Sequence, residues 1–168
     1  MVEKVGGAGG NWPRSNERRD ERVVTQQGSL YCGCACALTL LKLIGLQDLP
    51  TQEELYAAGG FGPLSVESLS AVLNDCGFCE GRWTGQGTSP PEGKDYTWIV
   101  RTLSDLGPWI AFFQEPLSRV GHFIVVAAVS ESIEILDPWE PGTAYEMTMD
   151  EFMGVWNYQA VYLIRRAK

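Results

Sequence analysis

The chemistry open to this sequence depends first on its single histidine, His122, because no other side chain among the 168 residues carries an imidazole. Imidazole is the side chain whose ordinary pKa lies nearest neutrality, so it is the usual general base of enzymes. His122 opens the stretch HFIVV, residues 122–126, whose β-branched and aromatic composition predicts a strand. The residue is therefore either a base at a strand end or a histidine with a structural role there.

Cys32 is the candidate nucleophile, since it stands where the polar segment TQQGS, residues 25–29, gives way to an apolar helix over residues 32–44. The unpaired N–H groups and the macrodipole at a helix N-terminus favour thiolate over thiol. Cys34 and Cys36 lie further along the same helix, where a thiol packs as a small hydrophobic group. The alternative interpretation is that all three cysteines only pack.

Asp137 is the candidate partner for the imidazole. It follows a strand expected over residues 132–136 and lies after a short turn near Ser130 that separates it from the strand of His122. The outer ends of such a hairpin come together, which would bring carboxylate and imidazole close. A carboxylate there fixes the histidine tautomer and stabilises the imidazolium. Asp137 could instead only begin a turn with Pro138.

The elements expected to position these residues are helices in the first half and strands in the second. Gly77 closes the third helix, and Thr51, Ser65 and Thr148 are expected N-caps. Helices are expected over residues 32–44, 51–56, 65–76, 96–106 and 148–156, and strands over residues 109–113, 122–129, 132–136 and 160–164, with a loop over 85–94. This order is typical of an α+β fold with a cleft between the halves.

Composition predicts a flexible glycine-rich and charged arm over residues 1–22, followed by one folded domain over residues 23–168. The net charge of −8 argues against binding to nucleic acid and against an electrostatic membrane anchor. We find no signal-peptide pattern, and the five cysteines are expected to be reduced. The expected location is the cytoplasm, or a target cell reached through a specialised export system.

Beyond these patterns, the segment QQGSLYCGCAC, residues 26–36, resembles the nucleophile segment of papain-like cysteine peptidases. The segments GHFIVV and ILDP, residues 121–126 and 135–138, resemble their base and orienter segments. The likeness runs over about residues 23–164. It is strongest to bacterial double-glycine leader peptidases and to papain-fold toxin or effector domains.

This resemblance implies an N-terminal helical lobe that carries the nucleophile helix, and an antiparallel β-sheet lobe that carries His122 and Asp137. It also implies that Gln26, six residues before Cys32, donates a hydrogen bond to the oxyanion of a tetrahedral intermediate. The expected activity is hydrolysis of a peptide or protein, without metal or organic cofactor. The expected partners are this substrate and an immunity or inhibitor protein.

Several alternatives remain open at this point. The nucleophile could be Cys34, with Gln27 seven residues before it. The same thiolate chemistry could serve a glutamine deamidase or an acyltransferase. A non-catalytic interaction module could instead bind peptides, or bind zinc through Cys76 and Cys79.

Overall fold

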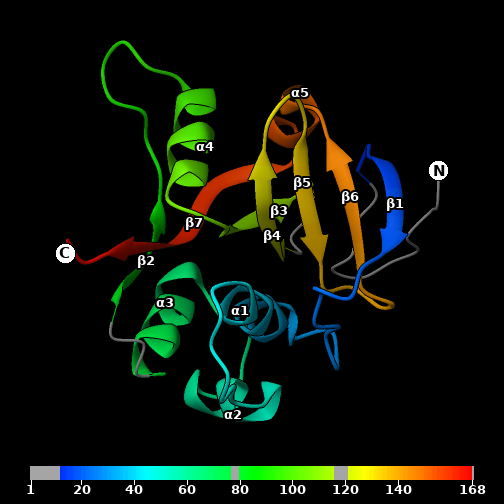
Figure 1. Cartoon of the computed structure of the whole chain (residues 1–168), viewed down its shortest axis with the longest axis vertical. Coiled ribbons are helices and arrows are strands. Elements are labelled where there is room, and N and C mark those ends of the chain that lie inside the picture. The colour runs from blue at the N-terminus through cyan, green and yellow to red at the C-terminus, as the bar shows by residue number, and fades with distance from the viewer. Residues whose placement is uncertain (1–11, 77–79, 116–120, 168) are drawn as a thin grey trace.

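The structure is a computed structural model that describes residues 12–76, 80–115 and 121–167 (Figure 1). Its elements follow one another as β1 (Ser15–Arg19), α1 (Cys32–Leu43), α2 (Gln52–Ala58), α3 (Val66–Asp75), β2 (Gly81–Gly87), α4 (Tyr96–Asp105), β3 (Trp109–Gln114), β4 (Gly121–Val129), β5 (Ile133–Asp137), β6 (Thr143–Met147), α5 (Met149–Met153) and β7 (Trp156–Arg165). The α+β prediction, with helices α1 to α3 ahead of an antiparallel sheet, is confirmed.

Four helices begin at side-chain caps, and a fifth does not. Thr51, Ser65 and Thr148 each accept a hydrogen bond from the backbone N–H three residues on, within a capping box, and the Asp95 side chain accepts from the Trp98 N–H at the start of α4. Helix α1 follows Tyr31, whose side chain makes no cap hydrogen bond. The N-terminal N–H groups of α1 are therefore not satisfied by a cap side chain, which matters for the residue that opens it.

In the part of the chain that the structure describes, seven strands form one sheet in the order β1-β6-β5-β4-β3-β7-β2, and every neighbouring pair is antiparallel. Strands β4 and β5 form the expected hairpin, in which Val126 pairs with Ile135. Strands β1, β2 and β6 were not expected. The arm predicted over residues 1–22 differs from the structure in its second half: Ser15–Arg19 pairs with β6, and Trp12 is buried.

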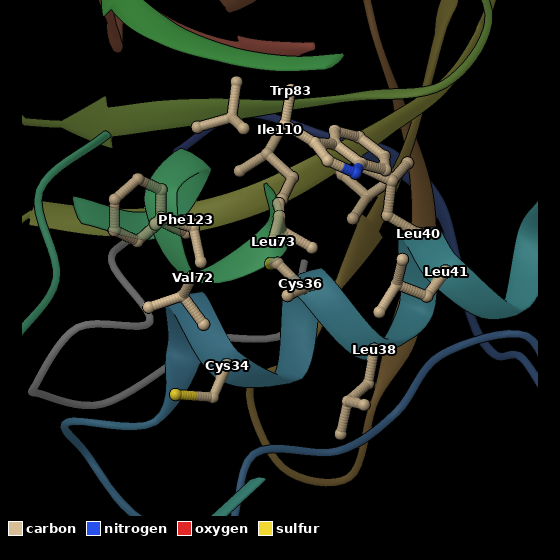
Figure 2. Packing of buried hydrophobic residues seen from close by; sticks show 14 of the residues in the cluster. Cys34, Cys36, Leu38, Leu40, Leu41, Val72, Leu73, Trp83, Ile110 and Phe123 are labelled. Atoms are coloured by element: carbon tan, nitrogen blue, oxygen red, sulfur yellow. The ribbon is translucent and has the colours of Figure 1, made fainter. Parts of the chain in front are cut away.

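Alternation along β4 divides the interior into two cores, one on each face of the sheet. Phe123 and Val125 pack with α1 and α3, whereas Ile124 and Val126 pack with α4 and α5. The helices α1, α2 and α3 lie together at the bottom of the view in Figure 1. Figure 2 shows Cys36, Leu73 and Ile110 gathered between α1, α3 and the strands.

Two element boundaries differ from those expected. Trp156 does not belong to the short helix capped by Thr148, because α5 ends at Met153 and Trp156 opens β7. The loop expected from residue 85 begins only after Gly87, where β2 ends. In the described part of the chain, we find no helix long and apolar enough to cross a membrane.

Candidate active site

His122 and Asp137 meet at the end of the β4–β5 hairpin, as the sequence predicted. His122 is the second residue of β4 and Asp137 the last residue of β5. The imidazole Nε2 lies 2.8 Å from the carboxylate Oδ1, and the two side chains are 1% and 0% exposed. A buried pair at this distance orients the ring and keeps one nitrogen engaged.

Cys32 is the first residue of α1 and is partly exposed, with its sulfur beside the imidazole of His122. Because Nε2 is engaged by Asp137, Nδ1 is the ring nitrogen left for the thiol, and it makes no hydrogen bond to any of the described residues. The backbone N–H groups of Phe123 and Gly33 also interact with the sulfur. The thiol thus lies among hydrogen-bond donors that favour its anion.

The charges at this site favour a thiolate–imidazolium pair. Burial raises the pKa of Cys32, but the adjacent polar and positively charged imidazole of His122, together with backbone N–H groups, outweighs burial and leaves that pKa lowered. Burial lowers the pKa of His122, but the charge and hydrogen bond of Asp137, with a contribution from Cys32, raise it to about 9. Both shifts favour a protonated imidazole beside a thiolate over the neutral pair.

The other cysteines of α1 lie in a different environment. Cys34 and Cys36 are fully buried, and burial raises the pKa of Cys34 to about 11 and that of Cys36 well above its ordinary value. This environment favours Cys32 over Cys34 as the nucleophile. In residues 12–76, 80–115 and 121–167, no three His, Cys, Asp or Glu side chains are grouped to hold a metal ion, and Cys79 lies outside these ranges.

Gln26 lies close to the start of α1 and is 8% exposed. Its Nε2 donates to the carbonyl of Gly28 at 2.8 Å, which engages one of the two amide hydrogens and leaves the second for another acceptor. Its backbone N–H donates to the carbonyl of Pro138 at 2.8 Å, just after Asp137. A pocket of about 130 Å³ opens here, lined by Gln26, Gln27, Gly28, Ser29, Trp139 and Glu140.

Gln52, a residue that the sequence did not single out, holds this segment in place. Its Nε2 donates to the carbonyl of Thr25 at 2.8 Å, and its Oε1 accepts from the N–H of Gln27 at 3.1 Å. Gln52 is buried at the start of α2, so that helix anchors the backbone on both sides of Gln26. Nothing in the local sequence distinguishes Gln52 from a surface residue of a capping box.

Asp137 has further partners that the sequence also did not predict. The hydroxyl of Tyr145 donates to Oδ2 at 2.8 Å, and the backbone N–H of Trp139 donates to Oδ1 at 2.9 Å. Trp12 in turn donates its indole N–H to the Tyr145 hydroxyl at 2.8 Å. A lone tryptophan in a glycine-rich and charged stretch is the signal that could have indicated a buried anchor at Trp12.

Comparisons with known proteins give a curated relative and solved structures of similar fold. No family model matches the chain. The chain is 31% identical over 167 residues to Cysteine protease effector 1 of Escherichia coli, an alignment that includes 96% of this chain. It spans only 31% of the length of that curated relative.

Two solved structures resemble the fold at 17% identity each. The peptidase domain of Streptococcus ComA, a bifunctional transporter of a quorum-sensing pathway, matches 86% of this chain and 98% of its own, with a TM-score of 0.64. A double glycine motif protease of an AMS/PCAT transporter, solved with a leader peptide, matches 97% of this chain and 96% of its own, with a TM-score of 0.62. The chain thus has the papain-like cysteine peptidase fold, in the form that these double-glycine peptidase domains share.

Proposed function

We propose that this chain is a cysteine peptidase domain in which Cys32 is the nucleophile, His122 the acid and base, and Asp137 the residue that orients His122. One observation carries the proposal: the single imidazole of the chain lies between the Cys32 thiol and the Asp137 carboxylate. The lowered pKa of Cys32 and the raised pKa of His122 are those of a reactive thiolate–imidazolium pair.

The mechanism follows from these positions. The Cys32 thiolate attacks the scissile carbonyl carbon, and the oxyanion accepts hydrogen bonds from the Cys32 N–H and from the second amide hydrogen of Gln26. His122 transfers its proton to the leaving amine as the C–N bond breaks, which gives a thioester on Cys32. His122 then removes a proton from water, the hydroxide attacks the thioester, and the product acid leaves with regeneration of the ion pair.

By likeness to the double glycine motif protease described above, the substrate that we propose is an extended peptide with small residues at the scissile bond. The PCAT peptidase named above was solved with a leader peptide and is named for a double glycine motif.

By likeness to the E. coli relative, we also propose that the domain acts as an effector on a protein of a target cell. Such an activity endangers the cell that makes it. An immunity or inhibitor protein that covers Cys32 is therefore part of the proposal.

Mass spectrometry of peptides incubated with the full chain tests this function. Peptides with an internal Gly-Gly pair and an internal glutamine should be cut into two fragments beside the glycines, and Cys32→Ala should abolish the cut. Cys34→Ala, the matched control, should retain it. An intact peptide that gains mass only at glutamine would instead identify a deamidase, and activity lost in Cys34→Ala but kept in Cys32→Ala would contradict the assignment of the nucleophile.

A further inference from the structure

A chain of buried hydrogen bonds continues from Asp137 away from His122. The Tyr145 hydroxyl donates to Asp137 Oδ2 at 2.8 Å and accepts the indole N–H of Trp12 at 2.8 Å. Trp12 is 3% exposed and Tyr145 is 0% exposed. Because the hydroxyl has one hydrogen, accepting from Trp12 directs that hydrogen toward the carboxylate.

Trp12 also packs directly on the imidazole. The Trp12 and His122 rings stack, with centroids 6.1 Å apart and an interplanar angle of 29°. Trp12 and Phe113 form a T-shaped pair with ring centroids 5.1 Å apart, and Phe113 is the residue of β3 that pairs with His122. The indole therefore fixes the plane of the imidazole and the orientation of the phenol at the same time.

We propose that Trp12 and Tyr145 are positioning residues of the active site, which hold the Asp137 carboxylate and the His122 ring in their reactive orientation. The proposal rests on the function proposed above and extends the active site to the N-terminal segment that precedes β1. Trp12 and Tyr145 act only through Asp137 and His122.

The physical reason is the rotational freedom of a buried carboxylate. Its two oxygens must both be satisfied, because an unpaired charge in the interior is costly. Oδ1 accepts from the Trp139 N–H and faces His122, while Oδ2 accepts from Tyr145. If the bond to Oδ2 is lost, the carboxylate can rotate away from Nε2, and the tautomer that presents Nδ1 to the thiol is no longer fixed.

The test compares Tyr145→Phe and Trp12→Phe with the controls Tyr162→Phe and Trp156→Phe. Tyr162→Phe removes a hydroxyl that accepts from Gln86 at 2.7 Å. Trp156→Phe removes a buried indole N–H that donates to the Gln159 carbonyl at 2.9 Å. Neither hydrogen bond reaches Asp137. Since the chain has one histidine, the ring NMR signals of His122 can be read without assignment.

Tyr145→Phe should lower kcat about tenfold with KM almost unchanged, the loss expected for one hydrogen bond to a charged group. The Nε2 proton of His122 should exchange with water about tenfold faster. Trp12→Phe should change both quantities in the same direction, and the two controls should leave both at the wild-type value.

Wild-type kcat and an unchanged His122 signal in Tyr145→Phe would overturn the proposal. If Trp12→Phe fails to fold, Tyr145→Phe still decides, because only an oxygen is removed. If the wild type cuts no peptide, the proposed function fails by itself. The His122 signal and the alkylation rate of Cys32 then still measure whether Tyr145 positions the imidazole.

Discussion

At the scale of single residues, the two nitrogens of the His122 ring have different tasks because their neighbours differ. Nε2 faces a buried carboxylate, which stabilises positive charge on the ring. Nδ1 is left for the thiol of Cys32, and in the proposed mechanism it takes up the proton of that thiol. In the mechanism proposed above, the same pairing makes the sulfur anionic and gives the leaving amine its proton.

The dependence of activity on pH should follow from these shifts. The ordinary pKa of a cysteine thiol is about 8.5. Because the pKa of Cys32 is lowered, its thiolate should already be present below that pH. Because the pKa of His122 is raised to about 9, kcat/KM should fall above that pH as the imidazolium loses the proton needed by the leaving group. We expect a bell-shaped profile with its descending limb near pH 9.

The pH profile is checked by peptide hydrolysis and, independently, by the rate of iodoacetamide alkylation of Cys32. Asp137→Asn is the informative variant, since removing the negative charge should lower the pKa of His122 and move the descending limb to lower pH. An alkylation rate that rises only around the ordinary thiol pKa in the wild type would contradict the ion pair.

Gln26 should matter for the transition state and not for the thiolate. Gln26→Ala removes the side-chain donor that we propose for the oxyanion, so kcat/KM should fall by about 10²-fold, as for other oxyanion-hole donors. The alkylation rate of Cys32 should stay at the wild-type value, because alkylation forms no oxyanion. Gln27→Ala, which changes the exposed neighbour, is the matched control, and an equal loss in both variants would argue against this role.

At the scale of elements, the helices and strands that could be predicted from the sequence are those whose ends carry a local signal. Thr51 with Glu54 forms the capping box expected from its spacing, and Thr148 is the expected N-cap of α5, since such hydrogen bonds depend only on neighbours in the chain. The hairpin that joins His122 to Asp137 is also local, because a short turn fixes its register. This is why the candidate site could be proposed before its geometry was known.

The strands that escaped prediction are those whose pairing is set at long range. β1 has the sequence SNERR, with no apolar residue, and it forms because β6 offers a free edge. β2 is glycine-rich and pairs with the distant β7. Trp12 and Tyr145 belong to these unexpected regions, so their approach to Asp137 could not be inferred from spacing.

The start of α2 offers a test that separates stability from activity. Thr51→Ala removes the N-cap and should cost about 1 kcal/mol of unfolding free energy, with kcat/KM nearly unchanged. Gln52→Ala removes both bonds to the segment around Gln26, so kcat/KM should fall about tenfold, with a loss of about 1–3 kcal/mol in stability.

Denaturant unfolding and peptide hydrolysis, measured on both variants, check this pair. The two residues are neighbours in one helix, so differences in expression or general folding affect them alike. If Gln52→Ala kept full activity, α2 would not be needed to hold the segment that carries Gln26.

At the scale of the whole molecule, one sheet separates two cores, and the site is built from both sides of it. Cys32 comes from α1, which packs with the core of Phe123 and Val125. Trp12 belongs to the opposite core, together with Ile124 and Val126. His122 lies on that same face of the sheet, because every second residue of β4 points to one side. The thiol and the imidazole therefore meet only if both cores are formed against the same strands.

Unfolding should accordingly be a single cooperative transition, in which damage to either core removes both. Leu73→Ala, in the core under α1 and α3, and Ile135→Ala, in the opposite core, should each cost about 2–5 kcal/mol of unfolding free energy.

In urea, alkylation of the buried Cys36 reports the first core, and the ring signal of His122 reports the second. Both should change at the same urea concentration as the far-UV circular dichroism in the wild type and in both variants. A variant in which Cys36 becomes reactive while His122 keeps its folded signal would show that the two cores unfold separately, and that the sheet does not couple them.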